Sequence, residues 1–306
     1  MPNILILSRN AEEYRRLLAD AELPGARWLT PDQPLADCEI VLGEPDRIRD
    51  ALARMPGLHW AQATWAGVEP LLEPSLRRDY LLTNARGVFG RLMSEYVLGY
   101  LLLHERRILQ RLEAQKQHRW DPTLTGTLRG KTIGLLGVGS IGAEVARAAK
   151  FFDMTVRGYT RASQSSPHVD AYYHGGALLE FAAGLDYLVS ILPNTAATRR
   201  VVNAELLARL PAHALFINVG RGAAVDEAAL LDALDSGRIA GAVLDVFETE
   251  PLPPEHRLWH ARNLLITSHT SAPSFPADIA RVFVDNYNRY IADEPLHYLV
   301  DFEKGY

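Results

Sequence analysis

The segment KTIGLLGVGSIGAEVARAAKFF, residues 131–152, combines three local patterns in one short stretch. An apolar run rich in β-forming residues comes first, a glycine-rich turn follows, and an alanine-rich stretch with helical spacing completes it. A strand that leads through glycines straight into a helix is the opening unit of a doubly wound parallel sheet. The segment therefore predicts an α/β fold, and the rest of the chain can be interpreted outward from it.

The three glycines of the turn, Gly137, Gly139 and Gly142, have the spacing GxGxxG. In a dinucleotide site the first glycine permits a tight turn, the second lets the backbone approach a pyrophosphate, and the third allows close packing of helix on strand. The N–H groups at the start of the helix, around Ser140 and Ile141, would face the phosphates. The alternative is a tight turn without a ligand, which the flanking strand and helix make the weaker interpretation.

The next expected strand, residues 154–160, bears on which dinucleotide binds. An NAD site usually carries Asp or Glu at this point, where the carboxylate accepts hydrogen bonds from the ribose hydroxyls. Here the segment from Val156 ends in Thr160 and Arg161 and contains no acid. Arg161 can pair with a 2′-phosphate and Thr160 can donate its hydroxyl, so the sequence favours NADP(H) over NAD(H). A solvated Arg161 beside an NAD site is the alternative.

Short apolar runs alternate with helical stretches along the whole chain of 306 residues, which predicts two domains with parallel sheets covered by helices. Strands are expected over residues 3–8, 39–43, 58–64, 81–84, 131–138, 154–160, 185–192, 214–220, 241–247 and 263–269. One long helix is expected from Ser94 to just before Asp121, where it could link the domains, and another over residues 278–293.

Composition restricts the possible partners. A net charge of −5 with scattered Lys and Arg favours neither nucleic acid nor an anionic membrane, and no apolar run reaches the roughly 20 residues of a membrane span. Cys38 is the only cysteine, which excludes an internal disulfide and fits a reducing, cytoplasmic location. The histidines show no thiol or carboxylate partner at metal-ligand spacing, so no zinc site is expected. A small-molecule ligand is the remaining expectation.

Four further motifs follow the glycine-rich turn in order: LPNTAAT, NVGRGAAVDEAALLDAL, GAVLDVFETEPLP and NLLITSHTSA. Together they resemble the D-isomer-specific 2-hydroxyacid dehydrogenase family over nearly the whole chain, and within it the glyoxylate/hydroxypyruvate reductase A type. The resemblance implies a flavodoxin-like substrate domain formed by residues 1–95 and 275–306. It also implies an inserted Rossmann-type domain over residues 96–274, an active site in the cleft between them, and a homodimer.

The resemblance also assigns the catalytic residues. Arg221 would grip the carboxylate of a 2-oxo acid and polarise its ketone, which suits a guanidinium, although a surface or ion-paired Arg is the alternative. His269 would donate the proton in reduction and accept it in oxidation, which an imidazole can do in both directions. Glu250 would orient the ring; Glu248 is close in sequence, but the family spacing of five residues after Asp245 selects Glu250.

Supporting roles follow from the same resemblance. Asp245 would accept a hydrogen bond from the nicotinamide carboxamide, and the glycines flanking Arg221 would let backbone pass close to nicotinamide and substrate. The remaining expected cofactor contacts are Leu192, Pro193, Asn194, Thr198, Val219 and Gly220, with His269 and Arg221 shared. In the first domain, the N–H groups of Ala66, Gly67 and Val68 would hold the substrate carboxylate, and Trp65 would either wall the pocket or pack against a neighbouring domain.

The segment after β-rich residues 263–267 departs from the family pattern. Ser268 stands where Pro is usual, and Thr270, Ser271 and Ala272 replace the commoner Ile-Ala-Gly. The function expected is NADPH-dependent reduction of a small 2-oxo acid, such as glyoxylate or hydroxypyruvate, to the D-2-hydroxy acid. The alternatives are an NAD-dependent dehydrogenase of another D-hydroxy acid and a non-catalytic, NAD(P)H-sensing protein resembling corepressors. A formate dehydrogenase is weaker, since that relative carries glutamine at the position of Glu250.

Overall fold

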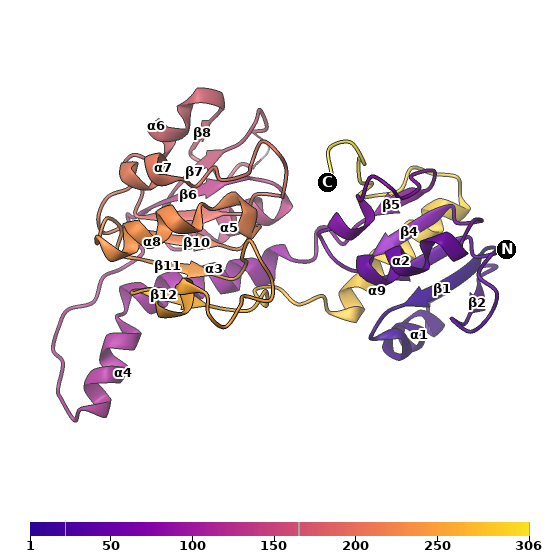
Figure 1. The fold of residues 1–306 in the computed structure, drawn as a ribbon, viewed down its shortest axis with the longest axis horizontal. Coiled ribbons are helices and arrows are strands. Elements are labelled where there is room, and N and C mark those ends of the chain that lie inside the picture. The colour runs from indigo at the N-terminus through magenta and orange to yellow at the C-terminus, as the bar shows by residue number, and fades with distance from the viewer. Residues whose placement is uncertain (22, 165, 306) are drawn as a thin grey trace. The chain divides into compact units, whose positions relative to one another are not determined.

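The computed structural model describes residues 1–21, 23–164 and 166–305, and it divides the chain into two compact units (Figure 1). The first unit combines Met1–Val88 with the segment from Ser274 onward, and the second is Phe89–Pro273. The first unit is therefore built from two segments that are separate in the sequence. No helix among the described residues is long and apolar enough to cross a membrane.

The first unit, called the substrate unit below, contains a five-stranded parallel sheet in the order β2-β1-β3-β4-β5, the flavodoxin-like order. On β4, Trp60 is fully buried and stacks on Phe283 of α9 at 5.2 Å, whereas Ala61 faces the core on the side of α2. This alternation covers both faces of the sheet. The elements of the unit are β1 (Asn3–Leu7), α1 (Ala11–Ala19), β2 (Arg27–Leu29), β3 (Ile40–Gly43), α2 (Pro45–Ala51), η1 (Leu52–Arg54), β4 (Trp60–Ala63), η2 (Glu69–Leu71), β5 (Leu81–Thr83) and α9 (Pro276–Ile291).

The second unit, called the dinucleotide unit below, contains a seven-stranded sheet in the order β12-β11-β10-β9-β6-β7-β8, also entirely parallel. Its elements are α3 (Gly90–Glu105), α4 (Ile108–Lys116), β6 (Thr132–Leu136), α5 (Ser140–Phe151), β7 (Thr155–Tyr159), β8 (Ala171–Tyr173), η3 (Gly175–Ala177), α6 (Leu178–Ala182), β9 (Tyr187–Ser190), α7 (Ala204–Arg209), β10 (Leu215–Asn218), η4 (Gly222–Ala224), α8 (Glu227–Asp235), β11 (Gly241–Leu244), η5 (Arg257–His260) and β12 (Leu264–Ile266). The chain builds the sheet in opposite directions from β6, so the crevice beyond the carboxyl ends of β6 and β9 is where ligands bind in such sheets.

Two apolar cores cover the faces of the larger sheet. Ile133 and Leu135 of β6 pack with α3 and α5, whereas Leu136 packs with α6, α7 and α8 on the other face. Gly134 leaves room for this second core, because a Cβ there would lie 2.3 Å from Leu185 Cδ1. The strands are therefore buried on both sides and position whatever follows their carboxyl ends.

The domain boundary lies at Val88, not at residue 95 as predicted, because α3 belongs wholly to the dinucleotide unit. Its first residue, Gly90, touches α5 so closely that a Cβ would lie 2.6 Å from Glu144 Cγ. Val97 and Leu101 continue this contact and are fully buried. The second boundary, at Pro273, differs from the prediction by a single position.

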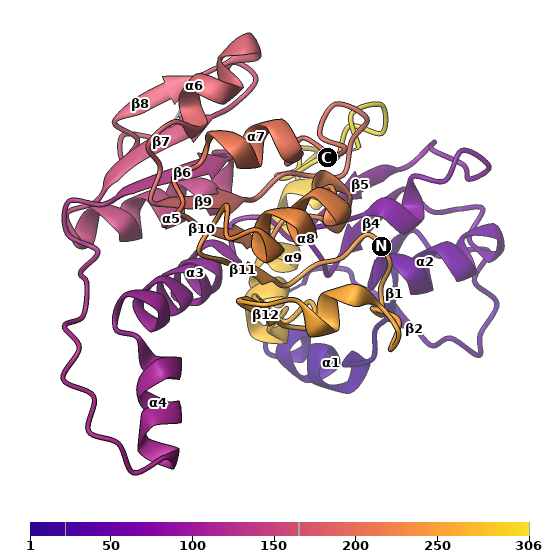
Figure 2. The same ribbon diagram turned by 60° about the vertical axis from the view of Figure 1, so that its left-hand side comes forward.

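The prediction of one long helix from Ser94 was wrong. Helix α3 ends at Glu105, Arg107 takes a left-handed φ of 53°, and α4 begins after it (Figures 1 and 2). The break contains neither Gly nor Pro, which are the residues by which a sequence usually announces one. Beyond the break, the apolar residues Ile108, Leu109 and Leu112 stay 42–48 % exposed, so the chain itself gives them no core to join.

Strands β2 and β8 were not predicted. Each has three residues and pairs with a single neighbour at one edge of its sheet. In β8 all three residues are only partly buried, so neither an alternating nor a continuous apolar pattern marks it. These strands form because a neighbouring strand offers them hydrogen bonds, which is information that the local sequence does not carry.

Candidate active site

The glycine-rich turn has the geometry that a pyrophosphate needs. Gly137 has a φ of +96°, and a Cβ on Gly142 would lie 2.4 Å from Gly137 O, so both glycines are required by the turn and by helix packing. Gly139 differs, since a Cβ there would meet no protein atom within 4 Å. Gly139 is also the N-cap residue of the twelve-residue helix α5, whose first N–H groups are available to an anion. The residues present therefore fit a dinucleotide phosphate.

Residues 191–192 and 219–220 come together with the glycine-rich turn at the carboxyl edge of the sheet. A Cβ on Gly137 would lie 3.2 Å from Ile191 O, and one on Gly220 would lie 2.6 Å from Leu192 N and O. Protein backbone fills the space beside Gly220 and Gly222, since a Cβ on Gly222 would lie 1.8 Å from Phe247 C. That these glycines let the backbone pass close to nicotinamide and substrate stays a prediction.

The loop after β9 is folded on itself. Thr198 Oγ1 donates to Pro193 O at 2.6 Å, which draws the end of LPNTAAT back onto its start, while Asn194 is exposed. The structure thus places these predicted contacts beside the turn, and their role toward the adenosine stays a prediction.

His269 and Glu250 form a hydrogen-bonded pair. His269 Nδ1 lies 2.8 Å from Glu250 Oε2, and a second oxygen of the carboxylate accepts from Phe247 N at 2.9 Å. The hydrogen bond to Glu250 raises the pKa of His269 above its ordinary value; burial and the charge of Arg221 act in the opposite direction and are outweighed. Burial opposes ionisation of Glu250, but its hydrogen bonds and the charges of His269 and Arg221 lower its pKa.

The hydrogen bond to Glu250 fixes the roles of the two ring nitrogens of His269. Because a carboxylate only accepts, Nδ1 carries a hydrogen, and Nε2 takes no part in this bond. The backbone of His269 has a left-handed φ of 56°, which a non-glycine residue adopts only when its surroundings hold it.

Asp245 supplies that restraint. Its carboxylate is fully buried and accepts hydrogen bonds from Thr270 N at 2.8 Å, Ser271 N at 3.0 Å and Thr267 Oγ1 at 2.5 Å. Its backbone oxygen accepts from His269 N at 2.8 Å. The predicted contact to the nicotinamide carboxamide would be a fourth hydrogen bond to this carboxylate, and it stays a prediction. Asp245 thus holds the chain by hydrogen bonds at Thr267, before His269, and at Thr270 and Ser271, after it.

Tyr96 extends this network to helix α3. Its hydroxyl lies 2.7 Å from Thr267 Oγ1, and since Thr267 donates to Asp245, Tyr96 is the donor in this bond. Neither Tyr96 nor Thr267 was predicted as a site residue. Tyr96 lies 171 positions before Thr267, so only folding brings the two hydroxyls together.

Arg221 follows β10 in a turn shaped by Asn218. The buried amide of Asn218 donates to Arg221 O at 3.1 Å and accepts from Gly220 N at 3.2 Å, which fixes both sides of the turn. Arg221 Nη1 donates to Gly220 O at 2.8 Å. Arg221, Asp245 and His269 follow the carboxyl ends of β10, β11 and β12, three neighbouring strands, and Arg221 acts electrostatically on both His269 and Glu250.

In the substrate unit, residues 65–68 follow the carboxyl end of β4 and form a loop with unused donors. Trp65 O accepts from Ala85 N at 3.0 Å and Ala66 O accepts from Asn84 Nδ2 at 2.8 Å, so the loop is held through its carbonyl groups. No hydrogen bond between described residues uses the N–H of Ala66, Gly67 or Val68. Three consecutive free N–H groups suit the binding of an anion.

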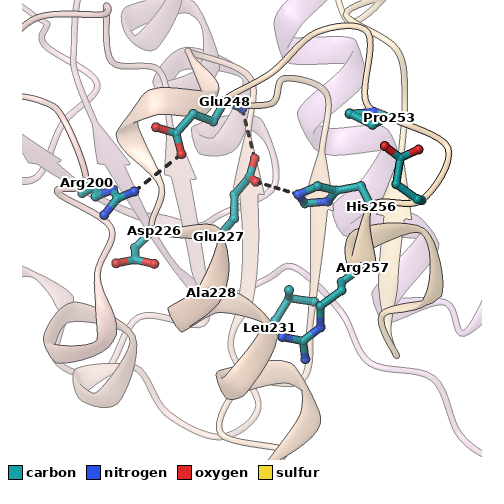
Figure 3. A pocket seen from close by; sticks show the side chains of 10 residues that line it. Arg200, Asp226, Glu227, Ala228, Leu231, Glu248, Pro253, His256 and Arg257 are labelled. Atoms are coloured by element: carbon teal, nitrogen blue, oxygen red, sulfur yellow. Dashed lines mark hydrogen bonds and ion pairs between the residues drawn. The ribbon is translucent and has the colours of Figure 1, made fainter.

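A cavity of about 640 Å³ in the dinucleotide unit separates the surroundings of Glu248 from those of Glu250 (Figure 3). Glu248 lines this cavity, where its carboxylate pairs with Arg199 at 2.6 Å and Arg200 at 3.8 Å and its N–H donates to Glu227. Neither Glu250 nor His269 lines it. Glu248 is therefore a structural ion-pair partner, and Glu250 is the carboxylate that meets the histidine.

No three or more His, Cys, Asp or Glu side chains of the described chain gather in a way that could hold a metal ion. Proton transfer at this edge of the sheet is instead available from the His269–Glu250 pair. A doubly wound sheet that presents a phosphate-binding turn and a carboxylate-paired imidazole at one edge has the architecture of a nicotinamide-dinucleotide-dependent oxidoreductase.

Comparison with known proteins gives the family. The family model "D-isomer specific 2-hydroxyacid dehydrogenase, NAD binding domain" matches residues 98–271. The glyoxylate/hydroxypyruvate reductase A of Klebsiella pneumoniae is 32% identical over 297 residues, covering 94% of each chain. The chain belongs to the D-isomer-specific 2-hydroxyacid dehydrogenase family, and it is an NAD(P)-dependent 2-hydroxyacid dehydrogenase or reductase.

Two solved structures agree along the whole chain. A D-isomer-specific 2-hydroxyacid dehydrogenase family protein from Aeromonas salmonicida is 43% identical, with a TM-score of 0.93 over 98% of this chain and 99% of that one. The NADPH-dependent glyoxylate/hydroxypyruvate reductase of Sinorhizobium meliloti, in complex with NADP and sulfate, is 30% identical, with a TM-score of 0.90 over 100% of both chains. The predicted fold and family are thus confirmed.

Proposed function

We propose that this protein reduces a small 2-oxo acid, such as glyoxylate or hydroxypyruvate, to the D-2-hydroxy acid with NADPH. The observation that carries the proposal is the His269–Glu250 hydrogen bond, with Arg221 close enough to act electrostatically on both partners. The similarity to reductases of glyoxylate and hydroxypyruvate supports the substrate class. When bound, the nicotinamide supplies a hydride to the ketone carbon. Residues of this chain bind the substrate and supply the proton.

Arg221 binds the carboxylate of the 2-oxo acid and stabilises the negative charge that develops on the ketone oxygen, because a guanidinium offers several donors in one plane. In the substrate unit, the N–H groups of residues 66–68 offer donors that suit a carboxylate, and Trp65 belongs to the same loop. His269 keeps its Nδ1–H on Glu250 and holds the reactive proton on Nε2, which passes to the ketone oxygen. In the reverse direction the neutral Nε2 takes the proton from the hydroxyl group.

The preference for NADPH rests on the end of β7. Thr160 and Arg161 follow this strand with no carboxylate to repel a 2′-phosphate, and the Sinorhizobium meliloti reductase was obtained in complex with NADP. Gly139 and the start of α5 hold the pyrophosphate, and Asp245 with residues 192–194, 198 and 219–220 holds the remainder of the dinucleotide. If Arg161 made no contact with the 2′-phosphate, this strand end would give NADP(H) no advantage over NAD(H).

The test is an absorbance assay of cofactor oxidation with glyoxylate, hydroxypyruvate and pyruvate, each with NADPH and NADH. Arg221→Ala should lower kcat/KM for the 2-oxo acids by about 10²- to 10⁴-fold, the loss of two charge-assisted hydrogen bonds. Arg199→Ala, which removes a cation paired with Glu248 in the same unit, is the matched control and should leave kcat/KM unchanged. Near-normal turnover in Arg221→Ala with intact NADP⁺ binding would refute the assignment. No oxidation with any 2-oxo acid would favour a cofactor-sensing protein.

We also propose that the protein is a homodimer in the cytoplasm. Residues 106–128, called the arm, leave apolar side chains outside any core of the chain: Ile108, Leu109 and Leu112 on α4, and Trp120 and Leu124, each 90% exposed. A second copy of the chain is the partner proposed to cover them, because a symmetric dimer can bury the same apolar patch of both copies against each other. Light scattering after size exclusion should give twice the chain mass for the wild type and the single mass for Leu112→Glu/Trp120→Glu. A monomeric wild type, or secretion of the native chain, would contradict this proposal.

A further inference from the structure

His174 lies beside the residues expected to meet the 2′-phosphate, although the sequence pattern gave it no role. It follows β8, which pairs with β7 so that Tyr173 lies opposite Tyr159, and Tyr173 O accepts from Thr160 N at 3.1 Å. The carboxyl ends of the two strands are therefore adjacent. This places the imidazole of His174 next to Thr160, at the position where dinucleotide sites of this sheet type distinguish a ribose hydroxyl from a phosphate.

The hydrogen bonds of the ring identify its two nitrogens. Nδ1 of His174 lies 3.0 Å from Thr160 O and 3.2 Å from Thr160 Oγ1. A carbonyl oxygen only accepts, so Nδ1 carries a hydrogen, and Thr160 Oγ1 is free to accept because it donates its own hydrogen to Ser163 O at 2.6 Å. Nε2 lies 3.1 Å from Gln164 Nε2, and in the neutral ring it accepts a hydrogen bond from this amide.

The surroundings of the ring favour the arrival of a negative charge. Tyr172 stacks against the imidazole with ring centroids 6.3 Å apart and the planes within 9°. None of the hydrogen bonds or ion pairs that join Thr160, Gln164 and His174 to other described residues involves a carboxylate. The charged neighbour along the strand end is Arg161, a cation. A proton added at Nε2 would replace the acceptor that faces Gln164 with a donor, and this donor needs an anionic oxygen or a rotated amide.

We propose that His174 is a part of the 2′-phosphate site, and that its protonated ring donates from Nε2 to a 2′-phosphate oxygen, displacing the amide of Gln164. This inference rests on the proposed use of NADPH and extends it. A charged imidazole donates from both ring nitrogens, so acid should strengthen the contribution of His174 to NADP(H) affinity. NAD(H) lacks the phosphate and should not respond.

The phosphate itself loses charge near pH 6, so the pH dependence of the wild type alone would mix two titrations. The comparison of wild type with His174→Gln separates them, because the ligand titrates identically in both. Glutamine keeps a donor for Thr160 but cannot become charged. His168→Gln changes another histidine of the same unit, one whose backbone N–H bonds Ser166, and serves as the matched control.

The experiment measures the Kd of NADP⁺ and NAD⁺ by titration calorimetry from about pH 5.5 to 8.5. At the acidic end His174→Gln should bind NADP⁺ about tenfold more weakly than wild type, and at the alkaline end the two should converge. The Kd of NAD⁺ should match throughout, and His168→Gln should behave as wild type. In parallel, the NMR signals of the His174 ring should shift on binding of NADP⁺ and stay unchanged with NAD⁺.

A loss of affinity in His174→Gln that is independent of pH, or equal for both cofactors, would overturn the proposal and leave His174 as a structural support for Thr160. The same would follow from NMR signals of the His174 ring that do not respond to NADP⁺. Failure of the proposed cofactor preference has a different signature. In that case wild type would bind NADP⁺ and NAD⁺ equally at the alkaline end, whatever the variant does at the acidic end.

Discussion

Replacing Gly139 by alanine should separate the stability of the protein from its affinity for cofactor. The added Cβ meets no protein atom within 4 Å, and the backbone, with φ −87° and ψ −158°, has the negative φ that alanine accepts. The free energy of unfolding should therefore stay unchanged or rise by up to about 1 kcal/mol, because alanine restricts the unfolded chain. The methyl group instead fills space at the N-terminus of α5, where a pyrophosphate would bind.

Overfilling a close-packed contact costs about 1–3 kcal/mol. At 1.4 kcal/mol per factor of ten, the Kd of NADP⁺ should rise about 5- to 150-fold in Gly139→Ala. Urea unfolding measures the free energy of unfolding, and titration calorimetry measures the Kd of NADP⁺. A variant that binds NADP⁺ within about twofold of wild type would refute the reasoning that this backbone segment is the surface the phosphates approach.

Two other glycines provide matched controls. Gly142→Ala would bring its Cβ to 2.4 Å from Gly137 O, so it should destabilise the protein by about 1–3 kcal/mol. Gly99→Ala lies on the exposed side of α3 with no atom within 4 Å, so it should stabilise the protein by about 0.5–1 kcal/mol and leave the Kd unchanged. Together the three variants distinguish a glycine needed by the fold from one needed by the ligand.

The remaining predictions concern the proton donor. Reduction requires protonated His269, whose pKa is raised by Glu250, so kcat/KM should fall as the pH rises through that raised value; Glu250→Gln should move this fall to lower pH, and Glu248→Gln should not. By the same sign, the His269–Glu250 pair stabilises the fold fully only between about pH 4.5 and pH 6.5. This contribution is lost as the pH rises through the raised pKa of His269 and as it falls through the lowered pKa of Glu250. A pH profile unmoved in Glu250→Gln would contradict the pairing. Thr267→Val removes the donor to Asp245 and should cost about 1.5–3 kcal/mol of stability, measured by urea unfolding, with a lower kcat and little change in cofactor Kd; unchanged kcat would show that the network does not position His269.

Sequence patterns predicted the parts of this protein that depend on neighbours along the chain. The glycine-rich turn was recognisable because a strand, three glycines and a helix must follow one another within about twenty residues to form a phosphate-binding turn. Arg221, Asp245 and His269 were predictable as a group because each follows a buried apolar run, and the carboxyl ends of parallel strands meet at one edge. The alternation of apolar runs and helices likewise predicted two parallel sheets.

Other features were decided only when distant segments met. The break at Arg107 has no helix-breaking residue, and the edge strand β8 exists only through its pairing with β7. The two glutamates differ in their contacts only in the folded chain: Glu250 is hydrogen-bonded to His269, whereas Glu248 pairs with Arg199 and Arg200. The same is true of the hydrogen bonds from Tyr96 through Thr267 to Asp245, and of His174 beside Thr160.

By itself, then, the sequence determined the fold class and the glycine-rich strand–turn–helix unit, because periodicity and spacing encode which backbone groups become adjacent within one such unit. The acid–base residues were named from the family resemblance, and their roles stay predictions. Tertiary structure decided how those residues are held and which partners they acquire. Hydrogen bonds such as the three that end on the buried carboxylate of Asp245 depend on a match of distance and direction between segments that only the packed sheet aligns.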